Sequence, residues 1–152
     1  MATILKAAVE PRSAGAPSPE LHTVVLLTSQ EVKALAATNI DLVPAPGAGL
    51  ALVPIRVVYS LDRNAAYDDA AADGDLVLAY KTTQTALITT EADTFIDAAA
   101  DRVTVEHPAV ADFVPEANTA IVIDNDGAEF TGDATNLNTL KITVYYIVVP
   151  MT

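Results

Sequence analysis

The chain has 152 residues, of which 51% are hydrophobic, contains no Trp, and carries a formal net charge of −12. A chain of this length buries about two-thirds of its unfolded surface, which predicts one domain whose core is built mainly from Ala, Val, Leu and Ile. The negative charge would repel phosphate backbones and anionic lipid headgroups, so we expect neither nucleic acid nor membrane as a direct partner.

The chain has no cysteine. This excludes disulfides, thiolate zinc sites and cysteine nucleophiles. The amino-terminal apolar run is too short for the core of a signal peptide, and no apolar run approaches the roughly 20 residues that span a bilayer. We therefore expect a protein that is made and used without classical secretion.

Residues 1–20 are predicted to form an extended arm, because they contain three of the nine prolines together with Gly15. Two interpretations are open. Chain termini are often untethered, or the arm lies against something, for which a neighbouring subunit is one candidate. In the second case its two basic residues, Lys6 and Arg12, are candidate interface residues.

Residues 21–152 are predicted to form a single β-sandwich domain that opens with a strand at 21–28. The second half of this strand is apolar on both faces, which predicts cover on both sides. The following residues, 29–37, predict a short helix with Ser29 as N-cap and Glu31 in its first turn.

Residues 39–60 predict a strand, a compact turn at 44–49 and a second strand, which we interpret as a hairpin. Pro54 cannot donate a backbone hydrogen bond, so the second strand should be an edge or bulged there. Val53 is expected to share a face with Ile55, Val57 and Tyr59. The glycine-rich turn lacks the Gly-Lys-Ser/Thr ending of a phosphate-binding loop, so its glycines are assigned to positive-φ positions.

Residues 62–133 carry 16 of the 20 acidic residues and three of the eight basic ones, which predicts the solvent-facing part of the domain. Short strands are expected within it, separated by turn residues, with a helical turn or two at 92–100. Such spacing is typical of a sandwich or barrel. The expected strands are 76–80, 85–89, 102–107 and 119–123.

Two acidic loops, 67–75 and 124–133, raise the alternative of a calcium site, because hard cations prefer carboxylate and carbonyl oxygens. Neither loop has EF-hand spacing, and Asp, Asn and Gly also form ordinary turns. We expect plain turns, no metal and no cofactor. A calorimetric titration with calcium that gives no heat would exclude the metal.

Catalytic patterns are sparse, so we expect no enzymatic activity. The two histidines, His22 and His107, belong to separate strands, and no nucleophile motif accompanies either of them. Carboxylate pairs could serve a glycosidase, but the chain has few aromatic residues to form a sugar-binding platform.

The last predicted strand, 139–150, alternates clearly. One face should belong to the core; it consists of Leu140, Ile142, Val144, Tyr146 and Val148. The other face begins polar and becomes apolar at Tyr145, Ile147 and Val149. These three residues form a candidate interface, to be covered by the amino-terminal segment or by a neighbouring subunit. This strand should share a sheet with, or face across the core from, one strand of 39–60.

A family resemblance rests on three features of the sequence, which are Leu42 to Gly49, Val57-Val58-Tyr59, and the turn Gly132-Asp133 leading into residues 140–146. Over residues 21–150 the chain resembles small jelly-roll head decoration, or cement, proteins of tailed bacteriophages. The resemblance implies an antiparallel β-sandwich of jelly-roll type. It also implies a virion protein that is made in the host cytoplasm and then located on the outside of the head.

Proteins of that family brace neighbouring capsomers, often as trimers at local threefold positions. The resemblance thus implies two partners, the major capsid protein and further copies of the chain itself. The alternative is a tail-associated or host-receptor module that binds a cell-surface glycan through the same kind of sandwich.

Overall fold

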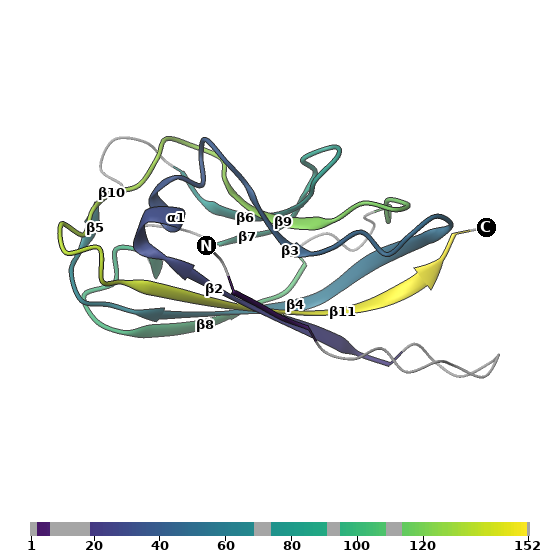
Figure 1. The fold of residues 1–152 in the computed structure, drawn as a ribbon, viewed down its shortest axis with the longest axis horizontal. Coiled ribbons are helices and arrows are strands. Elements are labelled where there is room, and N and C mark those ends of the chain that lie inside the picture. Colours follow the sequence, from purple (N-terminus) through teal and green to yellow (C-terminus); the bar gives the residue numbers. More distant parts are fainter. Residues whose placement is uncertain (1–2, 7–18, 69–73, 91–94, 109–113, 152) are drawn as a thin grey trace.

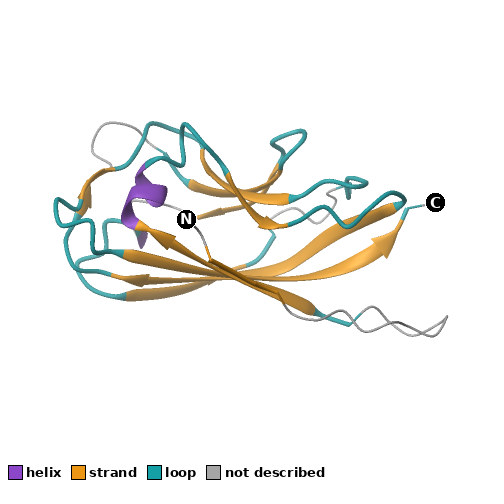
Figure 2. Ribbon diagram, viewed as in Figure 1, coloured by secondary structure: helices purple, strands orange, loops and turns teal. Residues whose placement is uncertain are grey.

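The protein is described by a computed structural model, in which residues 3–6, 19–68, 74–90, 95–108 and 114–151 are described. Two antiparallel sheets, one of five strands and one of four, pack face to face, and a two-stranded ribbon lies at one end (Figures 1 and 2). The predicted all-β sandwich is confirmed. Of the predicted arm, residues 1–2 and 7–18 lie outside the described residues.

The five-stranded sheet has the order β1-β2-β11-β4-β8, with all neighbours antiparallel. Its strands are β1 (Thr3–Lys6), β2 (Leu21–Thr28), β4 (Leu50–Asp62), β8 (Arg102–Glu106) and β11 (Thr139–Pro150). The long strand β11 lies at the centre and pairs with both β2 and β4. The strands predicted at 21–28 and 139–150 are confirmed at the same bounds, as is a shared sheet with one strand of 39–60.

The four-stranded sheet has the order β3-β9-β6-β7. Its strands are β3 (Ile40–Val43), β6 (Leu76–Tyr80), β7 (Ala86–Thr90) and β9 (Ile121–Asn125), and β5 (Tyr67–Asp68) pairs with β10 (Thr131–Gly132) in the ribbon. The strand predicted at 76–80 is confirmed. β7 and β9 are shifted by one and two residues from the strands predicted at 85–89 and 119–123, and β5 and β10 were not predicted.

The predicted hairpin at 39–60 is wrong, because β3 pairs with β9 in one sheet while β4 pairs with β11 in the other. The 44–49 loop crosses between the sheets, and its backbone groups bond to other segments. The N–H of Gly47 donates to Asn118 Oδ1 at 3.1 Å, and the N–H of Met151 donates to the carbonyl of Gly49 at 2.8 Å. Both glycines have positive φ, +105° and +72°, as predicted.

A β-bulge interrupts β4 near Pro54, as its sequence predicts. Tyr145 lies opposite Arg56 but Tyr146 lies opposite Pro54, so Ile55 is the extra residue. Because of the extra residue, side chains before Ile55 point to the opposite face from the one expected by counting back from Val57. The expectation that Val53 shares a face with Val57 and Tyr59 is therefore wrong, and the buried Leu52 and Pro54 take that place.

The core lies between the sheets and is built from alternate residues of nearly every strand. On β11 the predicted core residues Leu140, Ile142 and Val144 are no more than 1% exposed. The expectation that 62–133 is the solvent-facing part is wrong, because every residue of β6 is buried and three of the five residues of β9 are buried apolar side chains. The high acidic content of the whole segment belongs to its loops and does not reveal the short buried strands between them.

The short helix α1 (Ser29–Lys33) begins one residue earlier than predicted. Thr28 is the N-cap, because its backbone is extended and its side chain accepts from the N–H of Glu31. Glu31 completes a capping box by accepting from the N–H of Thr28 at 2.9 Å. Ser29 is instead buried. In the segment predicted to be helical at 92–100, residues 92–94 lie outside the described residues, Phe95 is helical, and a turn follows at residues 96–97.

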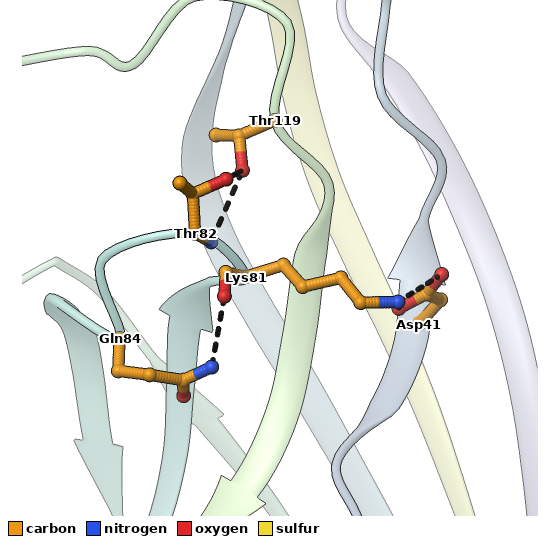
Figure 3. A network of polar contacts seen from close by, with 5 residues as sticks. All are labelled: Asp41, Lys81, Thr82, Gln84 and Thr119. Carbon is orange, nitrogen blue, oxygen red and sulfur yellow. Dashed lines mark hydrogen bonds and ion pairs between the residues drawn. The ribbon is translucent and has the colours of Figure 1, made fainter.

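Polar side chains fasten the loops to the sandwich. Lys33, at the end of α1, donates to Asn136 Oδ1 at 2.7 Å and to the carbonyl of Gly132 at 3.3 Å. Figure 3 shows a second link, in which Lys81, after β6, reaches Asp41 of β3 at 2.7 Å. In the same view Thr82 bonds to Thr119 at 2.8 Å. These contacts tie the β6–β7 turn to the neighbouring segments.

Candidate interaction surface

The face of the five-stranded sheet that points away from the core is the most distinctive surface of the molecule. In Figure 1 α1 and the four-stranded sheet lie on one side of it, and no described element lies on the opposite side. We call this side the outer face. The antiparallel register sets which residues share it, and one row across four strands consists of Val24, Thr143, Val58 and Val105.

Large apolar side chains are exposed on the outer face. Val103 is 65% exposed, Val105 49% and Leu26 45%. The expectation that the second half of the 21–28 strand is covered on both sides is therefore wrong for Leu26, because β2 has the core on one side and none of the described elements on the other. Together with the half-buried Val24 and Val58 on the same face, these exposed side chains make it a candidate interaction surface.

The predicted interface residues Tyr145, Ile147 and Val149 all lie on the outer face, and each is half-buried. Ile147 is opposite Val53 of β4, and Val149 is opposite Ala51. They prolong the apolar surface along β11 toward the carboxyl end.

Tyr145 is held by its cross-strand neighbours. Cζ of Arg56, on β4, lies 3.9 Å from the centroid of the Tyr145 ring, and the ring of His22, on β2, lies 5.7 Å away. Such cation–π contacts contribute about 0.5–1 kcal/mol at exposed sites. Arg56 is in turn paired with Glu20 at 3.0 Å. The Tyr145 ring therefore lies against side chains of the two strands that flank β11, namely Arg56 of β4 and His22 of β2.

Of the two basic residues predicted as interface contacts, the structure describes only the backbone of Lys6. The backbone of Lys6 lies in β1 opposite Thr23, so residues 3–6 extend the sheet beside β2 and do not lie over β11. Arg12 lies outside the described residues. Sequence patterning also missed Leu26, Val103 and Val105; the alternation of valines in 102–106 was the signal for the last two.

The outer face carries basic side chains although the chain as a whole is strongly acidic. Lys141 is exposed between Leu26 and Ser60 and has no ion pair with the described residues. Arg56 and His22 lie farther along the same face. A partner surface that combines apolar and acidic groups would complement this pattern.

Several described side-chain oxygens of the acidic loops accept hydrogen bonds from backbone groups in or next to these loops. The N–H of Asp75 donates to Asp126 Oδ1 at 2.7 Å, and the N–H of Gly127 donates to Asn125 Oδ1 at 2.9 Å. Part of the first loop, 69–73, lies outside the described residues. Within the described ranges, no group of three His, Asp or Glu side chains could hold a metal ion, and no helix is long and apolar enough to cross a bilayer.

No protein-family model and no curated protein sequence matches the chain. Among solved structures, a chain of the "Cyanophage Pam1 capsid asymmetric unit" matches with a TM-score of 0.52 and 15% identity. The match covers 94% of this chain and 93% of that chain. At this identity the likeness concerns the fold alone. The sandwich described here is thus similar in fold, over nearly its whole length, to a protein chain of a phage capsid.

Proposed function

We propose that this protein is a structural component of a tailed-phage virion, a decoration or cement protein that binds the outside of the head and stabilises contacts between capsomers. The observation that supports this most strongly is the likeness in fold to a capsid chain over nearly the full length of both chains. The strand orders β2-β11-β4-β8 and β3-β9-β6-β7 also support a fold of jelly-roll type, with two interleaved Greek keys.

The outer face of the five-stranded sheet is the proposed docking surface for the major capsid protein. Burial of Leu26, Tyr145 and Ile147 would provide a hydrophobic contribution, and Lys141 would pair with an acidic group of the capsid. The remaining surface carries the acidic loops and would face solvent. Many such contacts of modest strength act together once one of them is made, because each further engagement is effectively intramolecular.

The role would be mechanical and would require neither a cofactor nor a catalytic site. Further copies of the chain, with a trimer favoured, would surround a local symmetry axis of the head. The test uses heads produced without this protein, to which purified protein is added back. We expect heads that still assemble but release DNA at a lower temperature or at low magnesium, with stability restored by the added protein. Equal stability with and without the protein would contradict the proposed role.

A further inference from the structure

The edge strand β8 has an unusual combination of features. It pairs with β4 on one side, from Val57 to Leu61, and no hydrogen bond joins its other side to any described residue. Exposed strand edges are normally blocked by proline, bulges or inward-pointing charges. β8 has no proline and no bulge, its charged residues lie only at its two ends, and it exposes two valines, Val103 and Val105, on the outer face.

The sequence of β8 is complementary to itself when reversed. It reads Arg102-Val103-Thr104-Val105-Glu106. If two copies pair antiparallel about a twofold axis at Thr104, Arg102 lies opposite Glu106 of the second copy, and Val103 lies opposite its Val105. Each pair occurs twice. Cross-strand pairs of opposite charge and of β-branched residues are the combinations that stabilise antiparallel strands.

The charged residues are free to make these contacts. Arg102 is exposed and has no ion pair with the described residues. Glu106 accepts from Thr104 Oγ1 at 2.9 Å, which leaves its second oxygen for the guanidinium group of the other copy. Sliding the pairing by two residues would remove both charge pairs. The centred register therefore combines the most backbone contacts with all the charge pairs.

We propose that two copies of this chain associate by antiparallel pairing of β8, which joins their five-stranded sheets into one continuous sheet across a twofold axis. Such a contact uses one surface patch twice and closes without leaving a further β8 edge. The outer faces of the two copies then form a single larger surface. The association is a property of the free protein and does not depend on its role on the phage head.

The cysteine-free chain allows a direct test by cross-linking. In a Thr104→Cys variant the two introduced thiols would lie opposite each other at the twofold axis, so mild oxidation should convert most of the protein to a disulfide-linked dimer on a non-reducing gel. Thr89→Cys is the matched control, because Thr89 lies on β7, the edge strand of the other sheet, and is more exposed than Thr104. Equal or lower dimer yield for Thr104→Cys than for Thr89→Cys would overturn the pairing.

Charge reversal provides an independent measurement by analytical ultracentrifugation. Arg102→Glu and Glu106→Arg each place like charges opposite one another, and each should raise the dimer dissociation constant severalfold. The double variant, Arg102→Glu with Glu106→Arg, restores both pairs and should dimerise like the wild type. A double variant as weak as the single variants would contradict the proposed register. Because these experiments use the free protein, their failure would leave the head-binding role to be judged on its own test.

Discussion

Two isoleucines of β11 show how the effect of a substitution depends on where the side chain lies. Ile142 is fully buried in the core, whereas Ile147 is half-buried on the outer face. An aspartate at 142 places a charge in an apolar interior, which costs several kcal/mol because no partner compensates it. We expect Ile142→Asp to unfold the protein in circular dichroism melts.

The same substitution at 147 should leave the isolated fold largely intact but abolish association with heads, as measured by co-sedimentation. Tyr145→Asp should behave in the same way, because Tyr145 lies on the same face. If either variant unfolds as readily as Ile142→Asp, the residue belongs to an internal core and the interface is misplaced.

The carboxylate of Asp133 contributes stability that depends on pH. Burial alone would raise its pKa, but the neighbouring hydroxyls of Ser29 and Thr135, the N–H of Asn138 and the charge of Lys33 lower it below the usual value. Thr135 Oγ1 donates to Asp133 Oδ1 at 2.6 Å, and the Asn138 N–H donates to Oδ2 at 3.2 Å. Because the folded pKa is depressed, this stability is present above the ordinary Asp pKa of about 3.9 and is lost as the pH falls through the folded value.

Asp133→Asn should therefore lower the free energy of unfolding at pH 7 by about 1–3 kcal/mol, because the amide cannot accept every hydrogen bond that the carboxylate accepts. The same variant should lose less stability than the wild type when acidified. Urea denaturation at pH 7 and pH 3 measures both effects, with the exposed Asp62→Asn as control. Identical acid sensitivity of wild type and Asp133→Asn would contradict this assignment.

At the level of single residues, the sequence predicted those features that depend on local alternation. The faces of β11 and the irregularity at Pro54 were confirmed, because alternation and the missing proline N–H are local properties. The N-cap was misplaced by one residue, since Thr28 and Ser29 are both good caps and tertiary packing selected Thr28. The contacts of Arg56 with Tyr145 and Glu20 could not be predicted, because they join segments distant in sequence.

Among the elements, the link between β3 and β4 shows a limit of local patterns. A strand, a turn and a strand can form a hairpin or cross between two sheets, and both arrangements suit two apolar runs joined by a loop with positive-φ glycines. The choice depends on partners elsewhere in the chain, namely β9 for β3 and β11 for β4. The exposed edge at β8 follows from the same long-range pairing.

The loops before β6 and after β9 approach closely at Gly74. A Cβ atom added there would overlap the side chain of Asn125 and would lie 3.1 Å from Cα of Gly127. Asn125 cannot move away freely, because its Nδ2 donates to the carbonyl of Ala128 at 2.7 Å. We expect Gly74→Ala to destabilise the protein by about 1–3 kcal/mol, in line with overpacking of a tight site.

Thermal melting measures the effect of Gly74→Ala. Ala48→Gly, in the exposed 44–49 loop, is a control in which the side chain is removed at a surface position. A Gly74→Ala variant that melts with the wild type would show that the two loops are not packed against each other.

For the whole molecule, the distribution of charge and apolar surface determines what kind of partner it can bind more than any one contact does. Most of the acidic residues lie in the segment 62–133, while the outer face presents apolar side chains with Lys141, Arg56 and His22. The β-sandwich class was predicted from the many short strands and turns in the sequence. The apolar half of this face on β11 was predicted as a candidate interface, but its extent across β2 and β8 could not be predicted, because it depends on which strands share a sheet.

The position and orientation of this chain in an electron cryomicroscopy map of the phage that encodes it test the account most directly. We expect the chain on the outside of the head, with Leu26, Tyr145 and Ile147 directed toward the capsid shell and the acidic loops toward solvent. A chain located on the tail, or a head-bound chain whose outer face is turned toward solvent, would contradict the account.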